Sequence, residues 1–310
     1  MEKIGKENPG KENLTIVSIG EVLFDVFPCC RWLGGAPFNF IYHVNKLLGT
    51  GYFISRVGDD DSGREVLEKM AANDIPQDFV ETDKIHPTGA AIVSVDKDGN
   101  PHFTIKEDCA YDFIKITPQT RKFIDENATM LYYGSLAQRS SLSRQAIESL
   151  WRSGKKYFCD INIRQHFYNK EIITSSLMAA DVLKANLSEL ELISELLYGD
   201  IFEMDSAALK LMENFRIEML CVTMGADGAV LYKGMEKDTY KASVSQIADT
   251  VGAGDAYSAI LAIGFLKGWP LERINAFATE FASGICQIEG ALPVNDEFYE
   301  DYRRLISKVK

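Results

Sequence analysis

The sequence lacks the features of several protein classes. No apolar run approaches the roughly 20 residues that span a bilayer, and the first thirteen residues, MEKIGKENPGKEN, have no apolar centre of a secretory signal. We therefore expect a cytoplasmic protein. No basic cluster is present, because 33 Lys and Arg residues are scattered among 45 Asp and Glu residues, for a net charge of −12. This charge argues against nucleic acid or a membrane as a partner. Nucleotides stay open as ligands, since backbone amides and a divalent cation can supply positive potential inside a pocket.

The six cysteines show no C-x-x-C pair and no Cys/His spacing of a zinc site. Four of them lie in apolar or strand-like stretches, where we expect reduced, buried thiols: Cys109, Cys159, Cys221 and Cys286. The adjacent Cys29 and Cys30 differ from these four. A disulfide between neighbours is strained, so we interpret this pair as loop thiols without a function.

The distribution of apolar residues predicts one main α/β domain. The chain is 46% hydrophobic with only 9 Pro in 310 residues, a composition typical of a globular protein. Short apolar, β-branched runs alternate with helical patterns, which predicts parallel βαβ units and a doubly wound, mostly parallel sheet flanked by helices. We expect a flexible tail at residues 1–13 and the domain at 14–310. The predicted strands are Leu14–Ile19, Met130–Tyr133, Tyr157–Cys159, Val182–Lys184 and Met219–Thr223.

Capping residues and glycines predict where several helices begin and end. We expect a helix at Ser143–Ser153 that ends before Gly154, and one at Glu189–Leu197 with a capping box from Ser188 to Glu191. Asp205 is predicted to cap Ser206–Phe215. Two further helical patterns cover Tyr257–Lys267 and Asp296–Lys310.

One stretch interrupts the alternation of strands and helices. Ala90–Val95 and His102–Lys106 flank the turn-rich Asp98-Gly99-Asn100-Pro101, which predicts a hairpin. With the segment near 22–33, the segment near 88–113 is expected to form a small sheet that covers the site as a lid, because open α/β sheets bind ligands outside the carboxyl ends of their strands. An exposed edge of this sheet could pair two subunits in a homodimer.

The segment Asp249-Thr250-Val251-Gly252-Ala253-Gly254-Asp255-Ala256 carries the clearest chemistry. Small residues at the start of a helix let backbone N–H groups point at an anion, and the helix dipole adds positive potential. A carboxylate among these donors repels the anion unless it must take a proton from an attacking hydroxyl. A dinucleotide fingerprint fails because its last glycine is replaced by Tyr257, and no P-loop Gly-Lys-Ser/Thr occurs in the chain.

This segment resembles the D-T-x-G-A-G-D signature of the ribokinase family of carbohydrate kinases, the phosphofructokinase B type. Further likenesses follow in the family's order along nearly the whole chain, and the G-E-x-L-x-D start resembles fructokinases most. They are Gly20-Glu21 with Asp25, Gly34-Gly35-Ala36-Pro37-Phe38-Asn39, Val57–Gly63, Asp160-Ile161-Asn162-Ile163-Arg164, Asn186 with Glu189, Thr223–Gly228 and Gly290-Ala291.

The resemblance implies a role for each matching residue. Asp255 would be the general base, and the amides of Gly252, Ala253 and Gly254 would hold the transferring phosphoryl group. The acceptor sugar would be bound by Asp25, Gly34, Gly35, Asn39 and Arg164, the nucleotide by Asn186, Glu189, Thr223, Gly225 and Gly228, Mg²⁺ by Glu189, in part through water, and a monovalent cation such as K⁺ by Asp249 and Thr250.

The predicted activity is transfer of the γ-phosphoryl group of MgATP to a sugar, first of all to the 6-hydroxyl of fructose. Other acceptors in the same class are a ribose-like sugar and 2-keto-3-deoxygluconate. They stay open because Glu107–Asp112 departs from the Arg and Gly-Ala-Asp that fructokinase-like relatives often carry, and Lys106 could replace that Arg in charge only. A catalytically silent sugar sensor on the same fold would be expected to have lost the base or the glycine pair, and both are present here.

Overall fold

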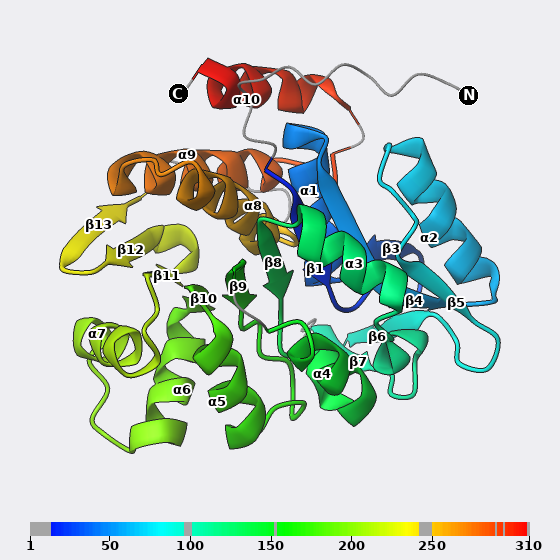
Figure 1. Cartoon of the computed structure of the whole chain (residues 1–310), viewed down its shortest axis with the longest axis horizontal. Coiled ribbons are helices and arrows are strands. Elements are labelled where there is room, and N and C mark those ends of the chain that lie inside the picture. Colours follow the sequence, from blue (N-terminus) through cyan, green and yellow to red (C-terminus); the bar gives the residue numbers. More distant parts are fainter. Residues whose placement is uncertain are drawn as a thin grey trace.

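The computed structural model describes residues 14–95, 101–151, 154–241, 250–288, 290–293 and 295–308. These residues form a nine-stranded sheet in the order β13-β12-β11-β10-β9-β8-β1-β4-β5, parallel from β11 to β5 and antiparallel at β12 and β13. The predicted doubly wound, mostly parallel sheet is confirmed (Figure 1). Its strands are β1 Ile16–Ile19, β4 Gly51–Gly58, β5 Val80–Asp83, β8 Met130–Tyr133, β9 Lys156–Asp160, β10 Val182–Asn186, β11 Met219–Thr223, β12 Ala229–Lys233 and β13 Glu236–Tyr240.

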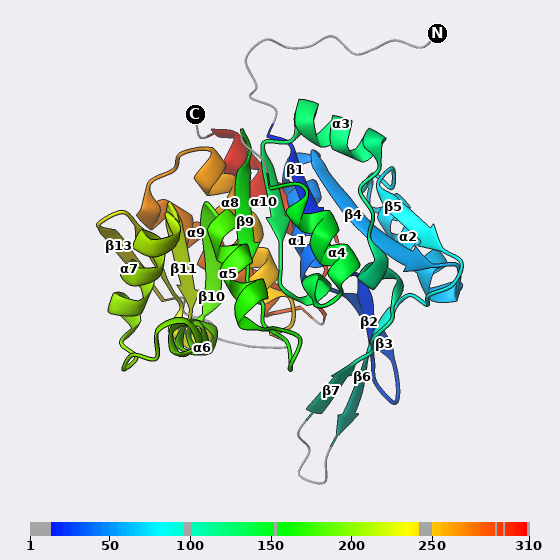
Figure 2. The ribbon, with the colours of Figure 1, turned by 60° about the horizontal axis from the view of Figure 1, so that its bottom comes forward.

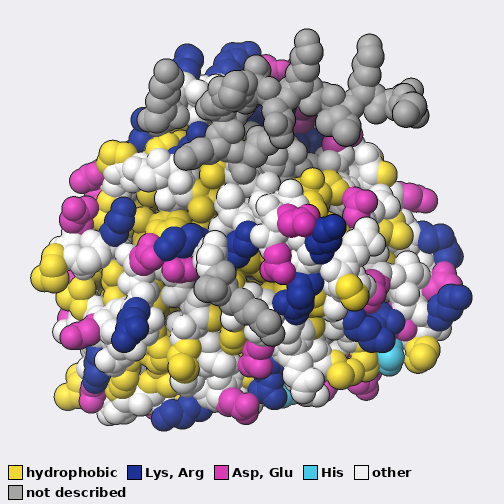
Figure 3. All heavy atoms as spheres, viewed as in Figure 1, with side chains coloured by type: hydrophobic (Ala, Val, Ile, Leu, Met, Phe, Trp, Pro, Cys, Tyr) yellow, Lys and Arg dark blue, Asp and Glu magenta, His cyan; other side chains and the backbone are white. Residues whose placement is uncertain are grey.

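Helices cover both faces of this sheet. One face carries α1 (Ala36–Leu48), α2 (Asp61–Ala72), α8 (Ala253–Leu266) and α9 (Leu271–Ile285), with α10 (Glu297–Lys308) packed outside α1. The other face carries α3 (Pro118–Asn127), α4 (Ser141–Glu148), α5 (Lys170–Ala179), α6 (Leu187–Tyr198) and α7 (Met204–Phe215). Among the described residues, no helix is long and apolar enough to cross a bilayer. Acidic and basic side chains are interspersed over the face drawn in Figure 3.

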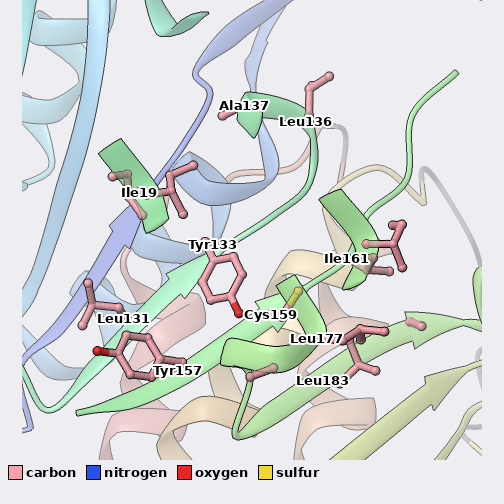
Figure 4. Close-up of a cluster of buried hydrophobic side chains, with 14 of the residues drawn as sticks. Ile19, Leu131, Tyr133, Leu136, Ala137, Tyr157, Cys159, Ile161, Leu177 and Leu183 are labelled. Atoms are coloured by element: carbon pink, nitrogen blue, oxygen red, sulfur yellow. The ribbon is translucent and has the colours of Figure 1, made fainter. Parts of the chain in front are cut away.

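The strands read as continuous apolar runs because both of their faces are buried. Successive side chains point to opposite faces, so Tyr132 belongs to the core on the α1 side and Tyr133 to the core on the α5 side. The same alternation separates Phe158 from Cys159 on the neighbouring strand. Figure 4 shows the second core, in which Tyr133, Cys159 and Leu177 lie close together between strands β8 and β9 and the α5 face.

Several predicted helix ends were wrong. Glu203 caps α7 by accepting from the Asp205 and Ser206 amides at 3.1 and 2.8 Å. Asp205 instead accepts from the Tyr232 hydroxyl at 2.6 Å and pairs with Lys237. Helix α4 begins two residues before the predicted Ser143 and ends at Glu148. Helix α8 begins at Ala253, so the helical pattern expected at Tyr257–Lys267 starts four residues earlier, within the glycine-rich segment itself.

A second, smaller sheet extends away from the main one (Figure 2). Its order is β3-β2-β6-β7, from β2 Leu23–Val26, β3 Arg31–Gly34, β6 Gly89–Val95 and β7 Pro101–Ile105. The antiparallel pairing of β6 with β7 is the predicted hairpin, while residues 96–100 of its turn, like the expected tail at 1–13, lie outside the described residues. Strand β2 pairs parallel with β6, so segments more than sixty positions apart join, with Leu23 beside Gly89.

Asp60 ties the base of the small sheet to the main domain. It is the N-cap of α2, where Oδ1 accepts from the Gly63 amide at 2.7 Å. The same carboxylate accepts from the Thr88 hydroxyl at 2.7 Å and from the Thr88 amide at 2.8 Å, immediately before β6 begins. Three hydrogen bonds therefore depend on one side chain.

Asp60→Ala is expected to lower the free energy of unfolding by about 2 kcal/mol, because it removes the cap and leaves the Thr88 amide and hydroxyl without their acceptor. Urea denaturation measures this change. The matched control is Asp61→Ala, whose side chain is 92% exposed and should change the stability by no more than about 0.5 kcal/mol. Equal stability of the two variants would contradict the assignment.

Candidate active site

The main cavity has a volume of about 570 Å³ and lies at the carboxyl ends of the parallel strands. Side chains that follow β1, β9, β10 and β11 form its floor, the start of α8 forms one wall, and the small sheet forms another. This is the location that an open α/β sheet predicts. The lining residues include Glu21, Leu23, Asp25, Gly35, Asn39, Ala91, Ile105, Asn162, Arg164, Lys184, Asn186, Glu189, Thr223, Thr250, Gly252, Gly254 and Asp255.

A second cavity of about 400 Å³ adjoins the first and shares four lining residues with it: Asn186, Thr223, Thr250 and Gly254. Its walls are mostly small and apolar groups from the loop after β11, from α8 and from α9. The two cavities therefore meet beside the glycine-rich start of α8.

Asp255 stands in the first turn of α8 at the wall of the main cavity. One of its carboxylate oxygens, Oδ2, accepts a hydrogen bond from the Asn39 amide group at 2.8 Å, which joins residues 216 positions apart. Burial raises the pKa of Asp255 to about 7, and the charge of Asp160 adds to this rise, while Asn39, Lys184 and Arg164 oppose it. Both the protonated and the ionised form of the carboxyl group are therefore accessible near neutral pH.

The backbone before Asp255 has the conformation that an anion-binding helix start requires. Gly252 is the N-cap of α8 at φ 79°, and a Cβ on it would lie 2.4 Å from the Cβ of Ala291, so only glycine fits. Gly254 is exposed and lines both cavities. The Ala253 amide donates to the Thr250 carbonyl oxygen over 3.4 Å, so that donor is already partly engaged within the chain.

The predicted acceptor-binding residues converge on the small-sheet side of the cavity, where Asp25, Gly35, Asn39 and Arg164 are lining residues. Burial raises the pKa of Asp25, and the Arg164 charge opposes this rise. Gly35 has φ 108°, and a Cβ there would lie 2.7 Å from the Glu21 carbonyl oxygen. Gly34 is not a lining residue, but a Cβ on it would lie 3.2 Å from Asp25 Oδ2. The lack of a side chain at Gly34 therefore leaves space beside the Asp25 carboxylate.

Glu21 is a cavity residue to which the sequence assigned no role. Its side chain is 2% exposed, and among the described residues its Oε2 has no hydrogen-bond partner. Burial raises its pKa to about 7, against the opposing effects of its own backbone amide and of Arg164. In the sequence, only its place in the Gly20-Glu21 motif pointed to Glu21.

Lys184 is the other functional candidate that sequence reasoning missed. Its ammonium group donates to both oxygens of Asp160, at 3.0 and 2.8 Å, and Asp160 also accepts from the Tyr132 hydroxyl at 3.1 Å and from the Ser258 hydroxyl at 2.8 Å. Burial disfavours the charged ammonium, yet the Asp160 carboxylate outweighs this effect and the pKa of Lys184 is raised. A Cβ on Gly254 would lie 3.4 Å from Lys184 Nζ. A buried cation therefore lies directly beneath the start of α8.

Asn186 and Glu189 form the capping box of α6, so the box predicted between Ser188 and Glu191 was wrong. Asn186 Oδ1 accepts from the Glu189 amide and Glu189 Oε2 accepts from the Asn186 amide, both at 2.8 Å. Glu189 Oε1 accepts from the Ile163 amide at 2.8 Å. Burial raises the pKa of Glu189 against the effect of the Asn186 amide. The predicted pair thus caps a helix and lines the cavity at the same time.

The predicted nucleotide-side residues border the second cavity. Thr223, Gly225 and Gly228 line it, and Gly228 has φ 87° with the Tyr240 carbonyl oxygen 2.0 Å from any Cβ. Sequence reasoning missed the opposite wall, because the amphipathic pattern of α9 predicts only core packing there. That wall is formed by Thr279, Ala282, Ser283 and Cys286.

The sequence predicted a monovalent-cation site at Asp249 and Thr250. Thr250 lines both cavities, but Asp249 lies outside the described residues. No group of three or more His, Cys, Asp or Glu side chains in the described part of the chain is arranged to hold a metal ion.

Lys106, considered from the sequence as a replacement for the arginine of fructokinase-like relatives, is exposed and lines neither cavity. Arg139 instead forms a bidentate pair with Asp112, at 2.8 Å for each bond.

The model of the pfkB family carbohydrate kinases matches residues 16–297. The chain therefore belongs to this family and is a carbohydrate kinase by family, and the resemblance drawn from its motifs is confirmed. The fructokinase of Escherichia coli is 30% identical over 241 residues, which cover 74% of this chain and 76% of that protein.

Two solved structures share the fold. The fructokinase of Xylella fastidiosa with bound ATP has a TM-score of 0.80 at 20% identity, and the match covers 95% of this chain and 98% of that one. A fructokinase double mutant of Vibrio cholerae, solved with fructose, ADP and a potassium ion, has a TM-score of 0.75 at 19% identity, covering 97% of this chain and all of that one. The predicted fold class, a parallel α/β sheet with a smaller second sheet, is confirmed.

Asp255→Asn is expected to raise the melting temperature at about pH 8, because it removes a carboxylate that burial and Asp160 disfavour in the folded state. The carboxyl pKa is 3.8 when unfolded and about 7 when folded, so the stability that it contributes falls as the pH rises through this window. The gain should therefore disappear near pH 4. Thermal melts at both pH values measure it, and Asp61→Asn, at an exposed carboxylate, is the control. An equal or lower melting temperature of Asp255→Asn at about pH 8 would contradict the raised pKa.

Proposed function

We propose that this carbohydrate kinase transfers the γ-phosphoryl group of MgATP to the 6-hydroxyl of fructose. One observation carries the proposal: a carboxyl group of raised pKa, Asp255, lies in the first turn of α8, where the two cavities meet. The main cavity would take the acceptor and the second cavity the nucleotide. The terminal phosphoryl group would then lie beside the start of α8.

Asp255 acts as the general base. It takes the proton of the acceptor hydroxyl as that oxygen attacks the γ-phosphorus, the bond to the bridging oxygen breaks, and ADP leaves. Its pKa of about 7 suits this role, because a base poised near the working pH is both available and strong enough to accept the proton. Asn39 holds the carboxylate by the hydrogen bond from its side-chain amide.

The phosphoryl charge is stabilised from the protein side by the start of α8 and by Lys184. The free amides of a first helical turn and the helix dipole favour an anion, and one well-placed donor is worth about 2.7–4 kcal/mol in such reactions. Lys184 has a third N–H beyond the two bonds to Asp160, and its ammonium lies against Gly254. It places positive charge beneath the amides at the point where negative charge is transferred.

Glu189 and Asn186 suit a magnesium ion carried by the nucleotide. Each oxygen of Glu189 accepts one backbone amide and keeps a further lone pair, and Glu189 lines the main cavity beside Asn186, which lines both cavities. Mg²⁺ usually keeps several waters and needs only one or two carboxylates, so a single protein carboxylate is enough for this mode. When bound, Mg²⁺ neutralises the charge on the phosphate oxygens. A potassium site near Thr250 is proposed by analogy with the Vibrio cholerae structure.

The charges of the cavity favour an uncharged acceptor. On the acceptor side, the described lining residues include three carboxyl groups, Glu21, Asp25 and Asp255, and one arginine, Arg164. Carboxyl groups and the amide of Asn39 pair well with vicinal hydroxyls, whereas a sugar acid would add a further negative charge to an acidic cavity. Leu23, Ala91 and Ile105 add an apolar wall from the small sheet. This arrangement and the fructokinases among the relatives support fructose over 2-keto-3-deoxygluconate.

The small sheet is proposed to act as the lid, since it supplies Asp25 and the apolar wall and would exclude water from the reacting groups. A homodimer through its edge and a cytoplasmic location stay predictions from the sequence.

Asp255→Asn is expected to lower kcat by about 10² to 10⁴-fold, because the acceptor hydroxyl loses its base. Fructose affinity, measured by calorimetry, should stay close to that of the wild type, because an asparagine can still accept from Asn39. Coupled ADP detection measures kcat, and Asp61→Asn should leave it unchanged. A decrease of less than about tenfold in the Asp255 variant would exclude this mechanism.

A panel of acceptors is expected to rank fructose first, ribose-like sugars lower and 2-keto-3-deoxygluconate last in kcat/KM, since the acidic cavity repels a carboxylate. Coupled ADP detection with and without potassium measures the ranking and the cation dependence together. A preference for the sugar acid would overturn the acceptor assignment. Fructose binding without phosphoryl transfer to any sugar would favour the sensor alternative.

A further inference from the structure

The turn between β2 and β3 places two thiols side by side on the surface. The Phe27 amide donates to the Cys30 carbonyl oxygen at 2.9 Å and closes the turn. Cys29 and Cys30 are both exposed, and their Sγ atoms lie 3.4 Å apart. In an extended strand neighbouring side chains point to opposite faces, so the turn is what brings these two sulfurs to one side.

The spacing favours a bridging atom over a direct bond. Adjacent Cα atoms are about 3.8 Å apart, which is shorter than the roughly 4.4–6.8 Å that most disulfides span. A disulfide between Cys29 and Cys30 would therefore be strained and easily reduced. An atom bound to both sulfurs removes this constraint, because the two Sγ atoms need not approach each other further.

The number of available ligands limits which atom can bridge. Zinc sites use three or four protein ligands, and no group of three or more His, Cys, Asp or Glu side chains occurs among the described residues. Two-coordinate Cu(I) and Hg(II) prefer sulfurs on opposite sides of the ion. Trivalent arsenic is pyramidal, binds two sulfurs on the same side and carries its own third substituent. Trivalent arsenic is also a soft acceptor, and soft acceptors bind thiolates preferentially.

We propose that Cys29 and Cys30 form a dithiol site for trivalent arsenicals in the turn between β2 and β3. For an organic arsenoxide, the two S–H bonds break, two As–S bonds form, and the arsenoxide oxygen leaves as water with both protons. No oxidation state changes, so the reaction needs no oxidant. This site replaces the interpretation of the two cysteines as loop thiols without a function.

The surroundings of the thiols connect this site to the rest of the small sheet. Trp32 follows Cys30 by two positions and stands opposite Asp25 in the β2–β3 register. A Cβ on Gly290 would lie 3.7 Å from the Trp32 ring, so the ring packs against the loop next to Gly252. Arg31 donates to the Ser62 hydroxyl at 3.0 Å on α2. The turn is thus held on two sides. Because Trp32 lies next to it, tryptophan fluorescence can report binding at the two sulfurs.

Phenylarsine oxide tests the proposal on the full chain. Mass spectrometry of the intact protein should show one phenylarsenic group per chain, stable to excess glutathione and removed by a small dithiol. Cys29→Ser and Cys30→Ser should each weaken binding by at least about 10²-fold, because the second bond of the chelate is lost. Binding should also change the tryptophan emission of the wild type, and this change should be absent in Trp32→Phe while the adduct still forms.

Cys286→Ser is the matched control, because Cys286 is a partly buried cysteine away from the turn, and it should bind phenylarsine oxide like the wild type. The cysteine variants alter an exposed turn, and thermal melts will establish that they fold. A glutathione-resistant adduct in the Cys29→Ser/Cys30→Ser double variant would overturn the proposal. So would a wild-type adduct that glutathione removes, since that is the behaviour of a single thiol.

Discussion

The buried ion pair between Lys184 and Asp160 is the interaction on which the organisation of the site depends. It joins β9 to β10 at their carboxyl ends, and hydrogen bonds from Tyr132 and Ser258 extend it to β8 and α8. A buried charge is tolerated only when it is paired and hydrogen-bonded, so these four elements are fixed relative to one another. The first turn of α8 is thereby fixed above the sheet, with Asp255 at the main cavity and Gly254 lining both cavities.

The same pair is consistent with the proposed phosphate site in a strongly acidic chain. With a net charge of −12, long-range attraction of an anionic ligand is unavailable. Positive potential has to be local, and it comes from the helix start and from an ammonium shielded from solvent. Carboxylates fill the other side of the cavity, where hydroxyl groups are the expected partners. The cavity therefore has positive potential near the start of α8 and carboxylates on its opposite side.

Much of the fold could be predicted because each buried strand reads as an apolar run of its own. Val182–Lys184 and Met219–Thr223 needed only local information. Helix ends were harder, since several residues near each end can cap, and tertiary contacts decide which one does. Asp205 was the obvious cap of α7 by sequence, but Tyr232 and Lys237 bind its carboxylate and leave the amides to Glu203.

For the site, Asp255 and the glycines before it could be predicted because the motif is contiguous. Lys184 could not, since a lysine at the end of an apolar strand carries no signal of what lies opposite it. The hydrogen-bond partner of Asp255 was also inaccessible to local reasoning, because Asn39 is 216 positions away. Family motifs pointed to Asn39, which lines the cavity, but gave no indication of its contact with Asp255.

The pairing of β2 with β6 has a consequence for the folding and the engineering of the chain. The small sheet consists of two excursions from the main domain, one between β1 and α1 and the other between β5 and α3. Neither excursion encodes it alone, so it cannot be excised, expressed or transplanted as a contiguous module. Its assembly must wait for the main sheet to bring the two excursions together, which makes it a late and non-local step of folding.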